Sequence, residues 1–383
     1  MREEALAASK GLKPTPAYLE RLTKTYGIEL TRWAFSQWEL RDRAKGKFKK
    51  AAEMLFDREA LEMATHEEVA TFHASLFPAG VRVADLTCGI GADLIALARN
   101  RDAIGFELDP IRAEYARHNL AVHDLKTEVR CEDSLDAHAD WEFAFADPAR
   151  RISDGGGRRV SRDGSSYSPS LESLTECFSS LKGWLIKLSP LLADSTLSSL
   201  SETQIFVSHQ GECKEVLCTN LPLPEGRAAG IWGYQVESAN WLPATVGQMG
   251  DEPRGTGAVS KLSVYEADPA AIRAHCLPTL CGQFNLEHLG DSNGYLIGAS
   301  GVKSAWLKEF EIMANPGNDE RALKRLIQEL GPKQVIVKQR GCNLDPVKVG
   351  RQLLPKPNVA GDVIVVLAFS VGKSLRYIIA KLP

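Results

Sequence analysis

Acidic residues and glycines stand at points where short apolar runs of this sequence end. The first such point is the stretch from Asp85 to Asp93, DLTCGIGAD, where an apolar run passes into a helical pattern. Gly89 and Gly91 let the backbone turn tightly beneath a bound ligand. A dinucleotide fingerprint would place a third glycine where Leu94 stands, and a phosphate-binding loop would continue into Gly-Lys-Ser/Thr, which this stretch does not. The turn therefore favours a ligand that neither of these two motifs binds.

Three acids indicate what that ligand is. Glu107 stands eighteen residues after Gly89, in GFELDP, and a carboxylate there can accept hydrogen bonds from both hydroxyls of a ribose. Asp133, in EDSLD, is placed to accept from an adenine amino group. Asp85 suits a cationic ammonium better than a pyrophosphate, which its carboxylate would repel. An adenosine with a cationic amino-acid tail would satisfy all three acids, and S-adenosylmethionine (SAM) is such a ligand.

Four motifs of this chain resemble, in order and spacing, the successive motifs of the class I SAM-dependent methyltransferases: DLTCGIGAD, GFELDP, EDSLD and ADPARR. A narrower resemblance covers nearly the whole chain. It is to a bacterial methyltransferase family with a THUMP-like C-terminal domain, and it rests on FDREALEMATHEEVA, DPARR, KLSP, SHQGECKE and VKQRGCNLDPVKVGRQL. The TCGIG turn and the helix before it are also similar, more distantly, to RNA cap guanine-N2 methyltransferases. The resemblance implies SAM as the cofactor, held by Asp85, Thr87, Cys88, Gly89, Gly91, Asp93, Glu107, Leu108 and Asp133.

The acceptor side of the site is expected at Asp147, which ends the fourth apolar run in AFADPARR. Methyl transfer from a sulfonium is an in-line displacement that disperses charge, so the protein mainly has to align two reactants and exclude water, and no metal is required. The Asp147 carboxylate can orient an exocyclic amine or take its proton late. The alternative is a strand-end carboxylate that caps the next turn. We expect catalytic roles for Asp147, Pro148 and Arg150, and substrate contacts from Arg151, Lys187 and Tyr167.

The residues after Asp147 narrow the chemistry. Amino-group methyltransferases of DNA and RNA usually place a Pro-aromatic pair after this Asp, with the aromatic ring stacked on a flipped base. Here the tetrad is Asp-Pro-Ala-Arg, which weakens adenine-N6 and cytosine-N4 chemistry unless Tyr167 or Trp184 supplies the stack. Pyrimidine-C5 RNA methyltransferases carry a nucleophilic Cys on the next strand, where this chain has Lys187-Leu-Ser-Pro. Covalent C5 chemistry is therefore disfavoured.

These residues need a parallel sheet to bring them together. From residue 81, short apolar runs alternate with helical periodicity, which is typical of βαβ units. Residues 1–75 have a helical pattern, and a stretch rich in glycine and charge near 245–260 separates a smaller α+β unit. We therefore predict an α/β protein with a helical N-terminal region (1–75), a Rossmann-like class I methyltransferase sheet (76–250) and a THUMP-like α+β domain (251–383).

Two basic clusters and one loop are candidate contacts for nucleic acid. Arg41–Lys50 carries six basic residues against one acid, and residues 321–351 hold eight against two. Each cluster is either a solvated face or a phosphate-contacting surface. Lys338 and Arg340, within the second cluster, have a domain interface as their alternative role. The loop at 149–169, with five arginines, is either disordered or a segment that grips the substrate.

The composition is that of an ordinary globular protein. The 383 residues include 46 basic and 49 acidic side chains, a formal net charge of -3, so overall charge does not mark a nucleic-acid binder. No apolar run is long enough to cross a bilayer and the first residues lack an apolar signal core, which favours a cytoplasmic protein. The eight cysteines are scattered, as reduced thiols are. Zinc binding by Cys213/Cys218 and Cys276/Cys281 is conceivable, but the usual gap between paired ligands is two residues and here it is four.

The leading hypothesis is a SAM-dependent methyltransferase that transfers a methyl group directly to a nitrogen of an RNA base, with the C-terminal domain holding the RNA. A second hypothesis keeps the enzyme class and replaces RNA by a protein or a small molecule. A third is a SAM-binding protein without turnover, and the four acids Asp85, Glu107, Asp133 and Asp147 argue against it. No membrane partner is expected, and the target base and the oligomeric state stay open.

Overall fold

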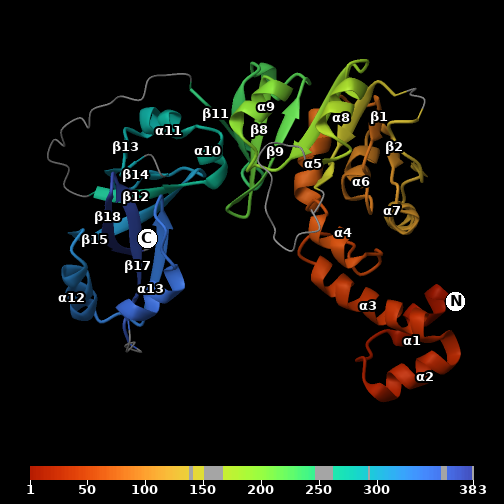
Figure 1. Ribbon diagram of the computed structural model, residues 1–383, viewed down its shortest axis with the longest axis horizontal. Coiled ribbons are helices and arrows are strands. Elements are labelled where there is room, and N and C mark those ends of the chain that lie inside the picture. Colours follow the sequence, from red (N-terminus) through yellow and green to blue (C-terminus); the bar gives the residue numbers. More distant parts are fainter. Residues whose placement is uncertain (138–140, 151–166, 246–261, 292–293, 355–359, 382–383) are drawn as a thin grey trace. The chain divides into compact units, whose positions relative to one another are not determined.

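The computed structural model describes residues 1–137, 141–150, 167–245, 262–291, 294–354 and 360–381 (Figure 1). The chain forms two compact units. The first consists of Met1–Thr203 and Leu217–Ala229, and the second of Gln204–Val216 and Gly230–Pro383. Arg151 and most of the arginine-rich loop, for which substrate contacts are expected, lie outside the described residues.

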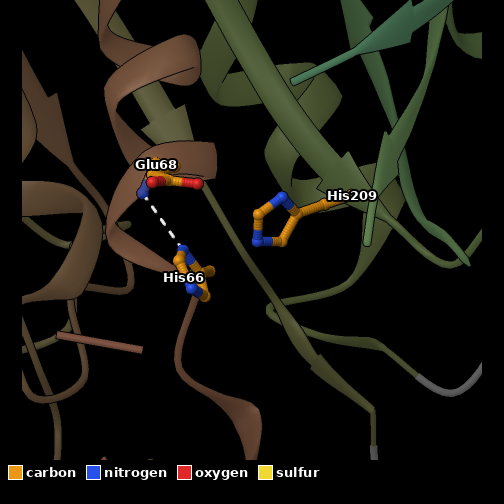
Figure 2. Close-up of side chains that lie close together, drawn as sticks. All are labelled: His66, Glu68 and His209. Atoms are coloured by element: carbon orange, nitrogen blue, oxygen red, sulfur yellow. Dashed lines mark hydrogen bonds between the residues drawn. The ribbon is translucent and has the colours of Figure 1, made fainter. Parts of the chain in front are cut away.

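The first unit begins with five helices, as the sequence predicts for the N-terminal region. They are α1 (Arg2–Ser9), α2 (Pro16–Tyr26), α3 (Ile28–Ala44), α4 (Arg58–Met63) and α5 (Glu67–Leu76). Polar side chains cap the starts of α4 and α5, the two helices that precede the sheet. The Asp57 carboxylate accepts from the backbone N–H of Ala60, and His66 Nδ1 accepts from that of Glu68 at 3.3 Å (Figure 2). These caps fix where α4 and α5 start.

A parallel sheet forms the core of the first unit. Its strands are β1 (Arg82–Asp85), β2 (Asp102–Phe106), β3 (Glu128–Arg130), β4 (Phe143–Ala146) and β7 (Gly183–Leu188), in the order β7-β4-β1-β2-β3, and neighbouring pairs are parallel. The crossover helices are α6 (Ala92–Ala98), α7 (Pro110–Val122) and α8 (Leu171–Phe178). Val83, Ala84 and Phe145 are buried on the central strands, as a sheet covered on both faces requires. This architecture confirms the predicted Rossmann-like sheet.

The strand order reverses next to β1. Strands β2 and β3 lie on one side of β1, and β4 and β7 lie on the other. The connections after β1 and β4 therefore diverge, and a crevice is expected at the carboxyl ends of these two strands. After β4 come the short strands β5 (Ala149–Arg150) and β6 (Tyr167–Ser168), which pair antiparallel. Helix α9 (Asp194–Leu200), the end of β9 (Glu212–Thr219) and the 3-10 turn η1 (Pro224–Gly226) complete the unit.

A buried amide ties the N-terminal segment to the glycine turn. Asn119 on α7 is fully buried. Its Oδ1 accepts from the backbone N–H of Leu55 at 2.7 Å, and its Nδ2 donates to the carbonyl oxygens of Leu55 at 3.0 Å and Ile90 at 2.9 Å. Leu55 precedes α4, and Ile90 lies between the two glycines of the turn. One side chain therefore holds two distant parts of the chain together.

The second unit contains a sheet of seven strands in the order β13-β14-β12-β15-β18-β17-β16. The strands are β12 (Leu262–Ala267), β13 (Glu287–His288), β14 (Tyr295–Ala299), β15 (Leu307–Gly317), β16 (Gln334–Arg340), β17 (Val363–Val371) and β18 (Ser374–Lys381). β16 is parallel to β17, and the other neighbouring pairs are antiparallel. Helices α12 (Glu320–Leu330) and α13 (Pro346–Leu353) bury Leu323, Ile327 and Leu353 in one apolar cluster with strand residues.

Shorter elements complete the second unit. Most of β8 (Thr203–His209) belongs to it, with β10 (Ile231–Gln235) parallel to β8 and β11 (Asn240–Pro243) antiparallel to β10. Helices α10 (Pro269–Arg273) and α11 (Leu277–Phe284) follow β12. Across the described part of both units, no helix has the combination of length and apolar character needed to cross a membrane.

All eight cysteines are free thiols. Desolvation by the surrounding protein raises the pKa of Cys213, Cys218 and Cys276 to about 12 each, and that of Cys281 to about 11. A thiol has to ionise before it binds a metal. Burial therefore disfavours the ionised form of all four thiols of the two pairs considered for zinc.

Gly105 lies where β2 passes closely beneath the glycine turn. A Cβ at this position would stand 2.4 Å from Leu94 Cδ2 and 3.1 Å from Cys88 Sγ. Gly105→Ala should lower the free energy of unfolding by about 1–3 kcal/mol, the range for overpacking a buried position. Gly46→Ala is the matched control, because a Cβ at Gly46 has no neighbour within 4 Å. Urea denaturation compares the two variants, and equal midpoints would show that the turn accommodates the methyl group without strain.

Candidate cofactor and acceptor site

A cavity of about 240 Å³ lies at the carboxyl ends of β1, β2 and β4 in the first unit. Its lining includes eight residues with predicted roles: Thr87, Cys88, Gly89, Asp93, Glu107, Leu108, Asp133 and Asp147. The segment that precedes α5 adds Ala60, Met63, Ala64 and Thr65, for which the sequence suggested no role. The cavity therefore stands at the switch point of the sheet and has a wall that comes from the N-terminal helices.

The glycine turn adopts the backbone that its sequence requires. Gly89 (φ 54°) and Gly91 (φ 90°) are both left-handed, and α6 begins directly after Gly91. The backbone N–H of Cys88 donates to the carbonyl oxygen of Phe106 at 2.8 Å, which anchors the turn to the end of β2. A Cβ at Gly89 would meet nothing within 4 Å, so the turn is open on that side. A ligand can therefore approach this backbone closely.

Asp85 is a buried carboxyl group, and only one of its two oxygens has a hydrogen-bond partner among the described residues. Its side chain is 1% exposed, and Oδ1 accepts from the backbone N–H of Thr87 at 3.2 Å. Among the residues described, no group hydrogen-bonds to its Oδ2. Burial raises the pKa of Asp85 well above its usual range, and the charge of Asp93 raises it further. A cationic ligand group is the partner that would satisfy this oxygen and lower the pKa again.

Glu107 and Asp133 stand at the ends of β2 and β3, as predicted, and both line the cavity. Each is half-buried, and each uses one oxygen to hold the turn that follows it. Glu107 Oε1 accepts from the backbone N–H of Asp109 at 2.8 Å, and Asp133 Oδ1 accepts from that of Leu135 at 3.0 Å. These bonds fix the orientation of two carboxylates that can accept further hydrogen bonds from a ribose or an adenine.

Apolar side chains accompany these acids at the cavity. Leu108 is 64% exposed and Met63 is 48% exposed, and both belong to the lining. Large exposed apolar groups beside a cavity favour a ligand with a flat hydrophobic part. Together with the cation-seeking Asp85 and the carboxylates of Glu107 and Asp133, they fit the ammonium, ribose and adenine of SAM.

Asp147 and Lys187 form an ion pair on the acceptor side. Lys187 Nζ lies 2.6 Å from Asp147 Oδ2, and the two side chains are 14% and 32% exposed. The backbone N–H of Asp147 donates to Thr87 Oγ1 at 2.7 Å, so this strand end is held against the glycine turn. Lys187, expected at the substrate rim, is instead largely buried and engaged with Asp147. The carboxylate remains accessible from the cavity.

Asp93, expected to contact the cofactor, is bound mainly by protein groups. It is 7% exposed, its Oδ1 lies 2.7 Å from His73 Nδ1, and its Oδ2 accepts from Thr65 Oγ1 at 2.7 Å. Thr65 in turn accepts from Lys187 Nζ at 3.0 Å. Sequence reasoning assigned no role to Thr65 or His73, although both lie within or close to the family-like segment FDREALEMATHEEVA. The available signal was the resemblance of that segment to the methyltransferase family.

The residues after Asp147 with predicted catalytic or substrate-binding roles have different surroundings. Pro148 is buried, and Arg150 on β5 pairs with Tyr167 on β6 through the backbone. Tyr167 is 4% exposed, and its hydroxyl accepts from the backbone N–H of Ser189 at 3.0 Å. Trp184 stacks on Phe178 with ring centroids 4.9 Å apart. Neither aromatic ring is in the cavity lining, so the structure does not bring the expected base stack to Asp147.

Three cations of the Arg41–Lys50 cluster donate hydrogen bonds to backbone carbonyl oxygens at helix ends and in loops. Arg41 is 6% exposed and donates to two carbonyl oxygens of the segment before α4. Lys47 Nζ donates to three carbonyl oxygens at and just after the end of α4, and Lys50 Nζ donates to the last carbonyl of α7. Cations at helix C-termini satisfy carbonyls that lack partners within the helix. These contacts give Arg41, Lys47 and Lys50 structural roles, while Arg43, Lys45 and Lys49 are exposed.

Comparisons with known proteins agree with this fold. No family model matches the chain. A protein of Mycobacterium tuberculosis CDC 1551 / Oshkosh named as an uncharacterized SAM-dependent methyltransferase is 28% identical over 334 residues, which cover 84% of this chain and 88% of that protein. Its counterpart in strain H37Rv has the same name, identity and coverage. The crystal structure of a putative methyltransferase from Porphyromonas gingivalis W83 superposes with a TM-score of 0.75 at 23% identity, over 99% of this chain and 98% of that one.

Sequence similarity to proteins named as SAM-dependent methyltransferases and a fold shared with a solved putative methyltransferase together support a SAM-dependent methyltransferase. The fold is shared along almost the full length of the solved Porphyromonas gingivalis protein, including both units of this chain. The named relatives are SAM-dependent methyltransferases. The cavity lining supplies carboxylates for a ribose and an adenine, and the buried carboxyl group of Asp85, which is not itself in the lining, directly precedes the lining residues Leu86 and Thr87.

The raised pKa of Asp85 predicts how SAM affinity depends on pH. In the empty site Asp85 stays protonated to a higher pH than an ordinary aspartic acid, and it must lose that proton before it pairs with an ammonium. SAM affinity should be constant above this raised pKa and fall as the pH drops below it, with proton release on binding in that range. Calorimetry in buffers of different ionisation enthalpy measures the released protons.

Asp85→Asn provides the control for this prediction. Because the amide cannot titrate, the variant should bind SAM more weakly and lose the Asp85-dependent part of the pH profile. The two proteins differ only at this side chain, so the difference between their pH profiles isolates the contribution of Asp85. Identical pH profiles for the two proteins would contradict the assignment of Asp85 to the cation.

Proposed function

We propose that this protein transfers a methyl group from SAM to a nitrogen of an RNA base. The observation that carries the proposal is the Asp147 carboxylate, which lines the cavity and has one oxygen held 2.6 Å from the Lys187 ammonium. When bound, SAM supplies a methyl group made electrophilic by its sulfonium. The residues of the chain have to hold cofactor and acceptor in line and exclude water.

We assign the cofactor side by charge and by position: Glu107, Asp133, Leu108 and Met63 line the cavity, and Asp85 precedes the lining residues Leu86 and Thr87. Asp85 holds the ammonium group, Glu107 the ribose hydroxyls and Asp133 the adenine amino group, while Leu108 and Met63 cover the adenine ring. This arrangement leaves Asp147, at the end of a different strand, to meet the acceptor. The division places cofactor groups at the ends of β1, β2 and β3 and the acceptor group at the end of β4.

An ion-paired carboxylate favours an amine as the acceptor. The Lys187 ammonium stabilises the charged form of Asp147, which makes this carboxylate a strong hydrogen-bond acceptor and a weak base. An exocyclic amine can donate an N–H to it and turn the nitrogen toward the methyl group before any proton is lost. A hydroxyl acceptor needs a base first. On β7, Lys187 stands where C5 methyltransferases need a thiol.

Exposed cations on two helices of the second unit support RNA as the carrier of that base. Helix α12 exposes Arg321, Lys324 and Arg325, and α13 exposes Lys348 and Arg351. Both helices pack on the same apolar cluster, so they cover the same face of the sheet. Cations on such a face attract phosphates without reading the sequence. We assign to this face the RNA-holding role expected of a THUMP-like domain.

Lys338 and Arg340 are less suited to that role. Lys338 Nζ lies 2.5 Å from Glu266 Oε2, and an Arg340 guanidinium nitrogen lies 3.4 Å from Glu266 Oε1. Their side chains are 34% and 26% exposed, and the Glu266 side chain is 12% exposed. A phosphate would have to compete with a largely buried carboxylate. The proposed phosphate contacts therefore belong to α12 and α13 and not to these two strand residues.

The proposal predicts one missing modification in cells that lack the gene. Nucleoside mass spectrometry of total RNA from cells with and without it should show one N-methylated nucleoside that disappears. The purified protein should restore it with SAM, and Asp147→Ala should reduce the transfer by at least about 100-fold, because positioning of the acceptor is lost. SAM affinity should change by less than about threefold in this variant. A parallel loss of SAM binding would make Asp147 a cofactor or structural residue, and unchanged RNA would contradict RNA as the substrate.

Charge reversal separates the two basic surfaces of the second unit. Lys324→Glu with Lys348→Glu places one change on each helix, and both side chains are exposed. This variant should weaken RNA binding and lower the slope of log K against log salt by about one per lost phosphate contact. Its melting temperature should match that of the wild type. Filter binding at several salt concentrations makes the measurement.

The matched control is Lys338→Gln with Arg340→Gln. It removes the same number of cations but breaks contacts to Glu266, so it should lower the melting temperature and leave the salt dependence of RNA binding nearly unchanged. If instead the control loses RNA affinity and the helix variant does not, the phosphate contacts lie on β16.

A further inference from the structure

A continuous row of hydrogen bonds runs from the core of the first unit to Asp147. His73 Nδ1 lies 2.7 Å from Asp93 Oδ1, and Thr65 Oγ1 lies 2.7 Å from Asp93 Oδ2. Lys187 Nζ lies 3.0 Å from Thr65 Oγ1 and 2.6 Å from Asp147 Oδ2. The five residues come from α5, the start of α6, the segment before α5, β7 and the end of β4. All belong to one compact unit.

The hydrogen bonds of this row have a fixed direction. Burial acts to raise the pKa of Asp93, but the hydrogen bonds from His73 and Thr65 and the charge of Lys187 hold it below its usual range. Asp93 is therefore a charged acceptor for both His73 and Thr65. Because the Thr65 hydroxyl gives its one proton to Asp93, its oxygen accepts from Lys187. Lys187 then donates in two directions, to Thr65 and to Asp147.

The row is stiff at its inner end and accessible at its outer end. His73 is 1% exposed, Thr65 6% and Asp93 7%, while the Asp147 side chain is 32% exposed. His73 also stacks on Phe145, with ring centroids 5.5 Å apart, and Phe145 lies two residues before Asp147 on β4. Packed aromatic contacts and buried charged hydrogen bonds leave these groups little freedom. The position of the Lys187 ammonium is thus set from inside the protein.

We propose that Thr65 is a positioning residue for methyl transfer, which holds the Lys187 ammonium and, through it, the Asp147 carboxylate that meets the acceptor. Asp93 and His73 anchor Thr65. This inference rests on the role of Asp147 in the proposed function. In-line displacement is sensitive to alignment, and a shift of about 1 Å in a reacting group can cost about 100-fold in rate.

Thr65→Val tests the inference because it keeps the shape of the side chain and removes only the hydroxyl. The acceptor is whichever of total RNA, total protein or metabolite extract, from a strain lacking the gene, the wild-type protein labels with tritiated SAM. Turnover at saturating SAM should fall by about 10- to 100-fold, while the dissociation constant for SAM stays within about threefold of wild type. Thr65→Ser restores the hydroxyl and should recover most of the lost turnover.

A double-mutant cycle shows whether Thr65 acts through the lysine. Lys187→Gln alone should lose at least as much turnover as Thr65→Val. The double variant should lose no more than Lys187→Gln within about threefold, because Thr65 has no further effect once the ammonium is gone. If the double variant instead loses turnover by the product of the two single losses, Thr65 and Lys187 act independently and the inference is overturned. Retained turnover in Thr65→Val, or a loss of SAM binding in proportion to the loss of turnover, would also overturn it.

Two further experiments cover the cases in which Thr65→Val is unstable or the substrate is not RNA. If Thr65→Val melts below the assay temperature, Asp93→Asn replaces it, because the amide keeps the side-chain volume and removes the charge that orients Thr65. Unchanged turnover in Asp93→Asn would then overturn the inference. If the wild type labels protein or metabolites and not RNA, the proposed RNA function fails, and the same cycle is run on the fraction that is labelled.

Discussion

Negative charges gathered in a buried pocket are the constraint on which the rest of this site depends. Asp85, Asp93 and Asp147 stand at the ends of β1 and β4 and the start of α6, where burial removes the water that would screen them. Each charge is met differently. Asp93 accepts from two protein donors, Asp147 pairs with an ammonium, and Asp85 keeps a raised pKa and one oxygen without a hydrogen-bond partner in the described part of the chain. A cationic cofactor completes this balance, and an anionic one would upset it.

The parallel sheet is what makes such a gathering possible. Parallel strands deliver their carboxyl ends to one edge, and the reversal of strand order beside β1 opens space between the connections that leave that edge. The glycine turn after β1 lies beneath this space, and Gly105 on β2 allows the two to pack closely. The same geometry that concentrates the acids also supplies the opening through which a ligand reaches them.

Sequence patterns could predict the sheet and the positions of acids at its strand ends because both follow from local rules. Alternating apolar runs and helical periods define βαβ units, a left-handed turn needs Gly89 and Gly91, and the strand ends at Glu107 and Asp133 follow from the length of each run. In each case the deciding interactions lie within a short stretch of chain.

Sequence patterns could not predict which groups the individual side chains contact. Lys187 pairs with Asp147, forty residues earlier in the sequence. The Tyr167 hydroxyl accepts a hydrogen bond from the backbone N–H of Ser189, which comes after α8 and β7. Lys47 ends a helix, although its neighbours in sequence suggested a phosphate surface. These outcomes depend on which segments meet in three dimensions, and a run of charges carries no information about its partners. The wall that α4 and its neighbours contribute to the cavity was missed for the same reason.

The contacts of Asn119, together with this wall, bear on how much of the chain the catalytic module needs. Its amide hydrogen-bonds both to Leu55, ahead of α4, and to Ile90 in the glycine turn, with no exposure to solvent. A fragment cut at the start of β1 would keep every residue of the sheet, yet it would expose this amide, strip Thr65 from Asp93 and open one side of the cavity. The smallest independent methyltransferase within this chain therefore begins ahead of the sheet, and the N-terminal helices are part of the enzyme core and not an appendage to it.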